Sequence, residues 1–132
     1  MHCSIHHTHL FASNMEATVR FFVQCFDGKV VLDGNFAGAR NVFIAVGKGR
    51  VHVYDQPPKA PGRSNVHHIG IQTDDIDAAA DRIRKAGVTL RKDVTDLGMW
   101  KYVMVPGPDD LLIELFEVDT TSIPRELAGY FV

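Results

Sequence analysis

Four residues with metal-binding side chains occupy matching positions in two copies of one sequence pattern. His7 stands in a strand-like segment just before a predicted helix, and His68 stands at the same point of the second copy, 68 − 7 = 61 residues later. Each copy ends in a short apolar strand with one polar residue, His52 or Glu114, at an offset of 114 − 52 = 62 residues. Imidazole and carboxylate are common ligands of divalent metals, and a repeat builds sites from equivalent positions. The sequence therefore predicts one divalent ion held by two residues from each copy.

Other side chains should share the face of these ligands, because alternate residues of a strand point to the same side. His9 is predicted to face the same way as His7, either as an acid/base or hydrogen-bonding group or as a satisfied cavity residue. The same alternation predicts substrate-contacting pocket walls at Tyr54, Trp100, Tyr102, Met104 and Phe116. Aromatic residues at strand spacing also form ordinary cores, so both interpretations stay open for these five positions.

The remaining histidines are given a structural interpretation. An isolated histidine is more often a hydrogen-bonded surface or core residue than a metal ligand, and this applies to His2 and His6. His67 should point to the opposite face from His68 and is also interpreted as structural.

The elements that must position these residues follow the order βαβββ in each copy. In the first copy, residues 5–55, we predict strands at 5–12, 29–33, 41–46 and 50–55 and a helix that Asn14 caps and Gly28 ends. In the second copy, residues 66–117, we predict strands at 66–72, 88–91, 100–105 and 111–117 and a helix that Asp74 or Asp75 caps and Gly87 ends.

The connections are predicted from glycine and proline content. The glycine-rich stretch 34–38 should be a loop, and the proline-rich stretch 56–65 should link the two copies. Residues 118–132 form a C-terminal tail with a brief helix, from which Tyr130 and Phe131 should dock on the domain or on a second chain. One copy would expose an apolar sheet face, so we expect a single α+β domain over residues 1–132, with two βαβββ modules forming a curved mixed sheet around the metal.

Composition narrows the partners. The 132 residues include 14 Lys and Arg against 16 Asp and Glu, a net charge of −2 with the signs interspersed, so we expect a small-molecule substrate rather than nucleic acid or an anionic membrane. Cys3 and Cys25 follow no disulfide or CxxC spacing, and we see neither a secretory signal nor an apolar run long enough to span a bilayer. A soluble cytoplasmic protein is therefore expected.

The doubled unit, with His on the first strand of each half and Glu on the last, resembles the vicinal oxygen chelate superfamily. That superfamily includes glyoxalase I, methylmalonyl-CoA epimerase, extradiol dioxygenases, and fosfomycin- and bleomycin-resistance proteins. Residues 67–78 (HHIGIQTDDIDA) and 106–115 (PGPDDLLIEL) look like its second-half signatures, and the likeness covers residues 5–117. The resemblance implies the glyoxalase/bleomycin resistance/dioxygenase fold and a homodimer.

The predicted ligand set favours proton abstraction next to a carbonyl. A divalent ion held by three imidazoles and one carboxylate leaves open positions for two substrate oxygens and stabilises an enolate. Glu114 is the first candidate for the base and His9 the second. We therefore expect an isomerase or lyase of glyoxalase or epimerase type, with Zn, Ni, Co, Mn or Fe as the ion.

Two other functions stay open. An Fe(II) extradiol-type dioxygenase would use His7, His68 and Glu114 as a two-histidine, one-carboxylate set, but His52 would then occupy a position that oxygen or catechol needs. A drug- or metabolite-binding resistance protein shares the fold, but such binders commonly lack the ligand set.

Overall fold

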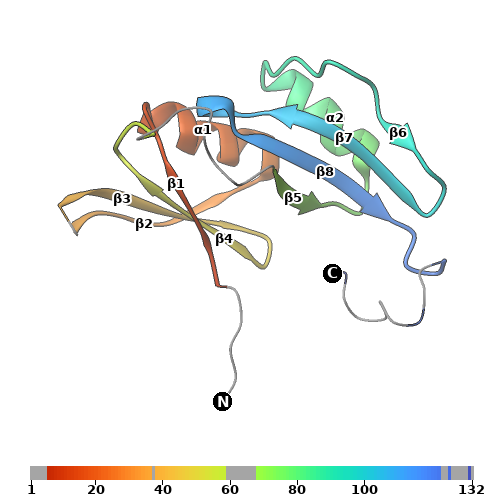
Figure 1. Ribbon diagram of the computed structural model, residues 1–132, viewed down its shortest axis with the longest axis horizontal. Coiled ribbons are helices and arrows are strands. Elements are labelled where there is room, and N and C mark those ends of the chain that lie inside the picture. Colours follow the sequence, from red (N-terminus) through yellow and green to blue (C-terminus); the bar gives the residue numbers. More distant parts are fainter. Residues whose placement is uncertain (1–5, 37, 59–67, 123–124, 126–130, 132) are drawn as a thin grey trace. The chain divides into compact units, whose positions relative to one another are not determined.

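The computed structural model describes residues 6–36, 38–58, 68–122, 125 and 131, and the chain divides into two compact units. The N-terminal unit is Met1–Arg63 and the C-terminal unit is Ser64–Val132. Each unit has the element order βαβββ and a four-stranded mixed sheet within the described residues (Figure 1). This confirms the predicted fold class.

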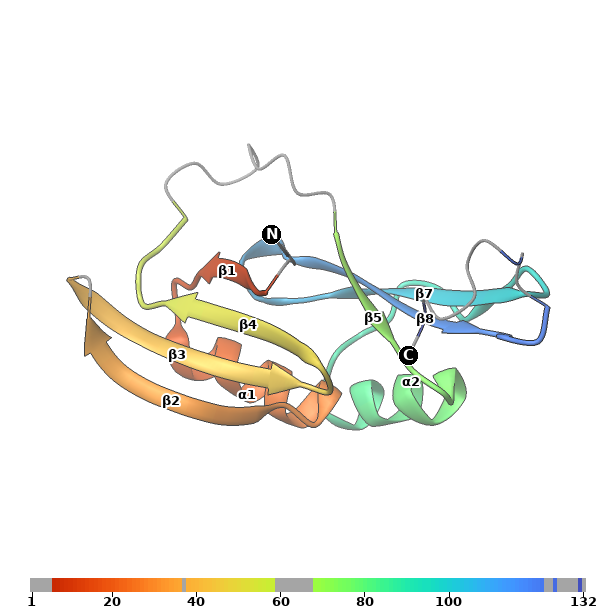
Figure 2. The same cartoon turned by 90° about the horizontal axis from the view of Figure 1, so that it is seen from below.

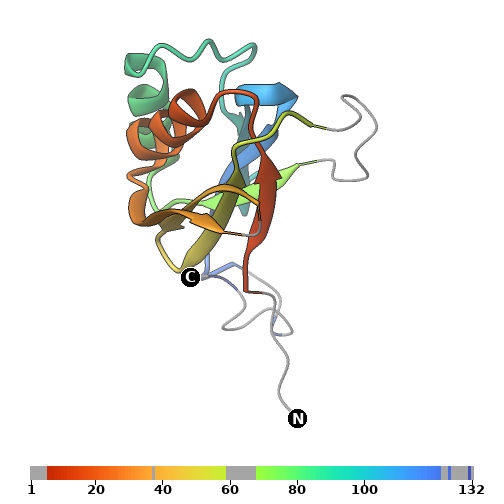
Figure 3. The ribbon, with the colours of Figure 1, turned by 90° about the vertical axis from the view of Figure 1, so that its left-hand side faces the viewer.

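In the N-terminal unit, the strand order in the sheet is β1-β4-β3-β2, with β1 parallel to β4 and the other neighbours antiparallel. Figure 3 shows α1 on one side of this sheet. The elements are β1 (Thr8–Phe11), α1 (Met15–Phe26), β2 (Lys29–Phe36), β3 (Ala39–Val46) and β4 (Gly49–Tyr54).

Helix α1 begins at the predicted cap, because the Asn14 side chain accepts a hydrogen bond from the backbone N–H of Ala17 at 2.9 Å. Its apolar side packs on the sheet, and Phe22 is fully buried. The left-handed residue that ends the helix is Asp27 (φ 53°), one position before the predicted Gly28. Gly28 instead permits close packing, since a Cβ there would lie 2.9 Å from Ile44 Cγ2.

In the C-terminal unit, the strand order is β5-β8-β7-β6, and β5 runs parallel to β8. Figure 2 shows β7 and β8 side by side as long strands. The elements are β5 (Ile69–Gln72), α2 (Ile76–Lys85), β6 (Thr95–Asp96), β7 (Trp100–Pro106), a 3₁₀ turn (Pro108–Asp110) and β8 (Leu112–Val118).

Helix α2 is capped by Asp75, whose side chain accepts from the Ala78 N–H at 2.9 Å, which settles the choice between Asp74 and Asp75. Glu117 Oε2 accepts a second first-turn N–H, that of Ile76, at 2.8 Å and so ties the end of β8 to the helix. Gly87 follows the helix with φ at 90°, as its predicted stop role requires.

Each sheet has a buried face and a more open face. In each unit the buried face packs with the helix to form the core; its sheet residues are Val42, Ile44, Val51 and Val53 in the N-terminal unit and Val103, Val105, Ile113 and Leu115 in the C-terminal unit. The alternating residues on the opposite faces include His9, His52, Tyr102, Met104 and Glu114, and none of these five is buried.

Two predicted segments are wrong. Residues 34–36 are not a loop: β2 continues through them and pairs to the end of its hairpin, Phe36 opposite Ala39, because glycine and asparagine still offer backbone groups to the ladder. Residues 88–91 are not a strand, since the Val88 N–H donates to Ile83 O at 3.2 Å and extends the helix cap. The outer strand β6 comes later and covers two residues.

Several predictions fall outside the described residues. These are the start of the first strand, most of the 56–65 linker, residues 66–67, His2, Cys3 and Tyr130, and all but Arg125 of the brief tail helix. Within the described part of the chain, the helices are too short or too polar to cross a bilayer.

Candidate metal centre

His52 lies between two rings on the open face of the N-terminal sheet. The His7 ring stacks on it with a centroid distance of 3.8 Å, and the Phe43 ring stacks on it at 3.6 Å. Phe43 is the cross-strand neighbour of His52 on β3, and His7 comes from the segment before β1, which runs parallel to β4. The first pair of predicted ligands is therefore in contact.

His9 faces the same side, as predicted. Its ring lies 5.9 Å from that of His7 and 5.8 Å from that of His52, and it stacks on Tyr54 at 3.9 Å. Burial lowers the pKa of His9, with a smaller contribution from the charge of His7. Burial also lowers the pKa of His52, followed by the charges of His7, His9, His6 and Arg50. Both rings therefore favour the neutral form, which has a lone pair available for a metal.

His6 joins this group, which the sequence did not predict. Its Nδ1 lies 3.1 Å from Nδ1 of His7, and ligand atoms of His6, His7 and His52 all lie within 4.8 Å of one another. The strand β1 begins only at Thr8, so the alternation used to assign faces does not apply to His6. The one signal in the sequence was that His6 directly precedes His7, a predicted ligand.

The second pair of predicted ligands is also in contact within its own unit. His68 Nε2 lies 3.1 Å from Glu114 Oε2, and both side chains are partly exposed. The other carboxylate oxygen, Oε1, accepts a hydrogen bond of 3.3 Å from the Trp100 indole N–H. Trp100 therefore helps to orient Glu114. The sequence predicted Trp100 only as a pocket-wall residue and did not predict this hydrogen bond.

The predicted pocket-wall residues of the C-terminal unit contact one another or are neighbours of Glu114. Trp100 stacks on Phe116 at 4.4 Å, and Phe131 meets both rings edge-on at 5.7 and 6.3 Å. Tyr102 is the cross-strand neighbour of Phe116, and Met104 is the neighbour of Glu114. Phe131 docks on its own unit, one of the two placements expected for the tail.

Strand pairing makes the two ligand pairs structurally equivalent. His9 pairs with His52 across β1 and β4, and Gly70 pairs with Glu114 across β5 and β8. His7 and His68 each lie two residues before the first partner in these pairings. The repeat predicted from sequence offsets is therefore present in the hydrogen-bond register as well.

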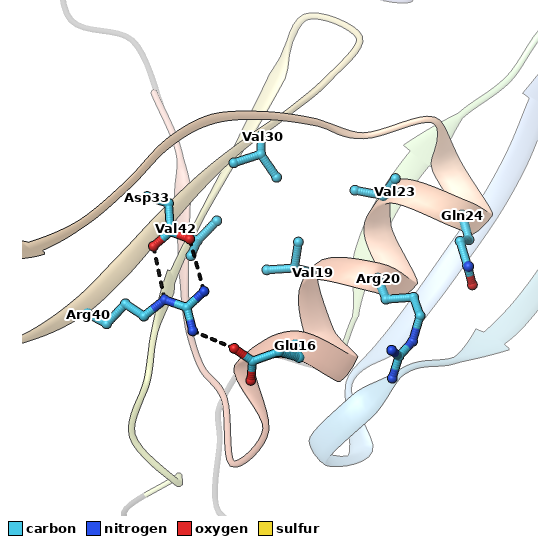
Figure 4. Close-up of a pocket in the computed structure, with 9 residues that line it drawn as sticks. All are labelled: Glu16, Val19, Arg20, Val23, Gln24, Val30, Asp33, Arg40 and Val42. Atoms are coloured by element: carbon cyan, nitrogen blue, oxygen red, sulfur yellow. Dashed lines mark hydrogen bonds and ion pairs between the residues drawn. The ribbon is translucent and has the colours of Figure 1, made fainter.

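A separate hollow of about 350 Å³ lies on the helix side of the N-terminal sheet, between α1 and strands β2 and β3 (Figure 4). Its apolar part is formed by four valines, Val19, Val23, Val30 and Val42. Arg40 closes one end with two 2.9 Å hydrogen bonds to the Asp33 carboxylate and a further bond to Glu16. Since its charge is matched by two carboxylates, this cluster has a structural explanation, and the lining includes none of the predicted site residues.

Each half of the chain is a βαβββ unit, with a histidine before its first strand and a histidine or glutamate on its last strand. Residues 4–115 match the Glyoxalase/Bleomycin resistance protein/Dioxygenase superfamily, and the chain belongs to it. This confirms the resemblance stated from the sequence. The comparison with curated proteins gave no match.

Solved structures support the same fold. The fosfomycin resistance protein FosX from Mesorhizobium loti is 23% identical with a TM-score of 0.71, covering 98% of this chain and 99% of that one. The E126Q mutant of Listeria monocytogenes FosX, complexed with Mn(II) and 1S,2S-dihydroxypropylphosphonic acid, is 18% identical with a TM-score of 0.71, covering 87% and 92%. The E144Q mutant of Zea mays glyoxalase I is 17% identical with a TM-score of 0.73, covering 83% of this chain and 43% of that one.

Proposed function

We propose that this protein is a divalent-metal-dependent enzyme, an isomerase or lyase that removes a proton next to a carbonyl of a small substrate with two neighbouring oxygens. The ion would be held by His7, His52, His68 and Glu114. The observation that carries the proposal is the equivalence of the two pairs: His7 contacts His52, and His68 contacts Glu114, in matching strand registers. Four residues with metal-binding side chains are not expected to fall at equivalent positions of the two copies by chance.

The donor set fits such an ion. Imidazole nitrogen and carboxylate oxygen suit Zn, Ni, Co, Mn and Fe, and geometry and supply choose among them. The lowered pKa of His52 keeps its nitrogen lone pair available at neutral pH. Metal binding by this fold is also supported by the Mn(II) complex of Listeria monocytogenes FosX, which has a similar structure.

The bound ion would act as a Lewis acid that stabilises negative charge on the substrate oxygens. Glu114 is the first candidate for the base, because its Oε2 contacts His68 Nε2 while Oε1 accepts a hydrogen bond from Trp100. His9 is the second candidate, because its imidazole lies on the same face as His7 with a lowered pKa. Phe116 and Trp100, the aromatic side chains beside Glu114, would shape the pocket and limit the access of water to it.

Two measurements test the proposal. Elemental analysis of untagged protein, prepared without chelator and loaded with Mn(II), is expected to give one Mn(II) ion per chain and a large loss in His7→Ala and Glu114→Ala. Deuterium exchange in D₂O, followed by NMR on a panel of 2-hydroxy ketones and 2-hydroxy thioesters, is expected to show metal-dependent exchange at the carbon next to the carbonyl. Unchanged metal content in both variants would refute the metal centre.

A second candidate function is a ring-cleaving Fe(II) dioxygenase that uses His7, His68 and Glu114 alone. It is favoured by one observation: the His52 ring is held between Phe43 and His7, as a packed side chain would be. His52→Ala separates the two functions. Iron retained in that variant, together with oxygen uptake on catechols, favours the dioxygenase, whereas metal lost from it favours the four-ligand enzyme.

A cytoplasmic homodimer completes the proposal. Members of this superfamily build their sites from βαβββ modules, and exchange of modules between two chains is compatible with a centre that needs one pair from each half. Light scattering of the purified protein is expected to give the mass of two chains.

A further inference from the structure

We infer that the N-terminal unit has a metal site of its own, formed by the imidazoles of His6, His7 and His52. It shares His7 and His52 with the proposed centre, but it needs neither His68 nor Glu114. The site would hold a borderline divalent ion such as Ni(II), Cu(II) or Zn(II). The inference concerns metal binding by this unit and stands apart from the enzymatic reaction proposed above.

The positions of the ring nitrogens support three-imidazole coordination. Two ligand nitrogens about 2.05 Å from a tetrahedral ion lie about 3.4 Å apart. Nδ1 of His6 and Nδ1 of His7 are already 3.1 Å apart, and the ligand atoms of all three residues lie within 4.8 Å of one another. Closing the remaining gaps needs side-chain shifts of about 1 Å, small beside the freedom of an exposed rotamer.

The two shared residues of this site are held by ring stacking. His52 is fixed by its stack on Phe43 at 3.6 Å, and His7 stacks on His52 at 3.8 Å. His6 contacts both rings edge-on, at 5.4 Å from His7 and 6.2 Å from His52, and it is exposed. An ion can therefore reach His6 from solvent and bind against a preformed pair.

The donor set predicts a metal preference that separates this site from the proposed centre. Three neutral imidazoles leave the full double charge on the ion, and nitrogen-only sites follow the order Mn < Co < Ni < Cu > Zn steeply. A site that includes the Glu114 carboxylate also accepts the harder Mn(II) ion. Loss of the C-terminal ligands should therefore abolish Mn(II) binding and spare Ni(II).

The test uses the full-length untagged chain with the double substitution His68→Ala and Glu114→Ala. Calorimetric titration is expected to show one equivalent of Ni(II) bound and no Mn(II). Adding His6→Ala to the double variant should weaken Ni(II) binding by at least about tenfold. The matched control adds His9→Ala, which removes a nearby imidazole outside the group and should leave Ni(II) affinity unchanged.

Three results would overturn the inference: no Ni(II) binding by the double variant, no effect of His6→Ala, or equal effects of His6→Ala and His9→Ala. Circular dichroism checks the fold, and His68→Asn with Glu114→Gln replaces the alanine pair if that pair unfolds. The proposed function fails on different evidence, namely Mn(II) binding that is the same in the wild type and in Glu114→Ala. The experiments can therefore refute the three-histidine site without refuting the four-ligand centre, and the reverse.

Discussion

The two units share strand order and register, yet they surround equivalent positions with different chemistry. The N-terminal unit places His52 among imidazoles and an aromatic ring, with His7 and Phe43 on its two sides. The C-terminal unit places Glu114 between His68 and the Trp100 indole N–H. The two halves therefore share the candidate ligand positions: both are imidazoles in the N-terminal half, and one is a carboxylate in the C-terminal half.

The same contrast appears two residues after the first ligand of each half. In the N-terminal unit this position is His9, whose ring stacks on Tyr54 at 3.9 Å. In the C-terminal unit it is Gly70, where an added Cβ would lie 3.3 Å from the Phe116 ring. The Phe116 ring thus takes the space that a side chain would need, so this position carries an imidazole in the N-terminal half and no side chain in the C-terminal half.

The largest expected effect tests whether the two units are energetically independent. Phe22→Ala removes a fully buried ring from the N-terminal core and should cost about 3–5 kcal/mol of unfolding free energy. A unit of about 60 residues buries a smaller share of its surface than a larger domain and is only marginally stable alone, so hydrogen exchange should accelerate in both sheets. The matched change Ile83→Ala in α2 should act in the same way. Faster exchange confined to the mutated unit would show two separately stable halves.

The next effect distinguishes the two candidate bases. Glu114→Gln should lower the rate of proton exchange by about 10²–10⁴-fold, the usual contribution of a general base. His9→Gln should leave the metal in place and lower the rate by only about tenfold, since an orienting hydrogen bond is a smaller effect than a base. The reverse order, with metal retained in both variants, would assign the base to the imidazole of the N-terminal half.

The repeat predicted most of the fold and the contacts within each ligand pair. Offsets of 61 and 62 residues were enough to match His7 with His68 and His52 with Glu114, because side-chain direction in paired strands follows from register. The cap Asn14 was predictable from the residue type, and the second cap was narrowed to Asp74 or Asp75, of which the structure has Asp75. The extent of the outer strand β2 and the place of β6 were not predictable in this way. Pairing at a sheet edge depends on the neighbouring strand, so glycine did not end β2, and Val88 joined the helix cap instead of a strand.

The side-chain environment of the site was less predictable for a related reason. Alternation predicts the sheet face on which a side chain lies but not the atoms that it contacts. It therefore predicted Trp100 as a pocket-wall residue and did not predict its hydrogen bond to Glu114. His6 lies in the predicted strand 5–12, but β1 begins only at Thr8, so the backbone at His6 is not set by the ladder and alternation does not hold there. Both positions depend on tertiary contacts that a strand pattern does not encode.

A smaller effect tests the orientation of the carboxylate in the C-terminal half. Trp100→Phe keeps an aromatic ring against Phe116 but removes the indole N–H that Glu114 Oε1 accepts at 3.3 Å. Loss of such a supporting bond should weaken metal affinity by about tenfold, with the fold unchanged. Met104→Leu, a neutral change opposite Glu114, is the matched control. Equal affinities for Trp100→Phe and the wild type would show that the bond does not orient Glu114.

Trp100 also provides an optical measurement, because it is the only tryptophan in the chain. Its fluorescence should change when an ion binds Glu114, and the change should disappear in Glu114→Gln. An identical change in that variant would mean that the metal acts on Trp100 by another route.

The smallest effect concerns protons on the imidazoles of the N-terminal half. Burial lowers the pKa of both His9 and His52, so their neutral forms are favoured in the folded state. Between the lowered values and the ordinary value near 6.5, the unfolded chain binds more protons than the folded one, so stability rises with pH. The contribution is complete above about pH 6.5 and is lost as the pH falls through that value towards the folded pKa values.

Urea unfolding of the metal-free protein, in chelator at pH 7.5, 6.0 and 5.0, measures this loss. The urea midpoint should fall at each of these pH steps, and the double variant His9→Gln with His52→Gln should show a weaker dependence of the midpoint on pH.

The carboxylates of Glu16 and Asp33 act in a separate range: hydrogen bonds from Arg40 lower their pKa values, so their contributions to stability persist until the pH falls below about 4.5. If the unfolding midpoint fell equally in the wild type and the double variant between pH 7.5 and 5.0, the acid sensitivity would come from groups other than His9 and His52. The N-terminal half would then not be the source of the pH dependence.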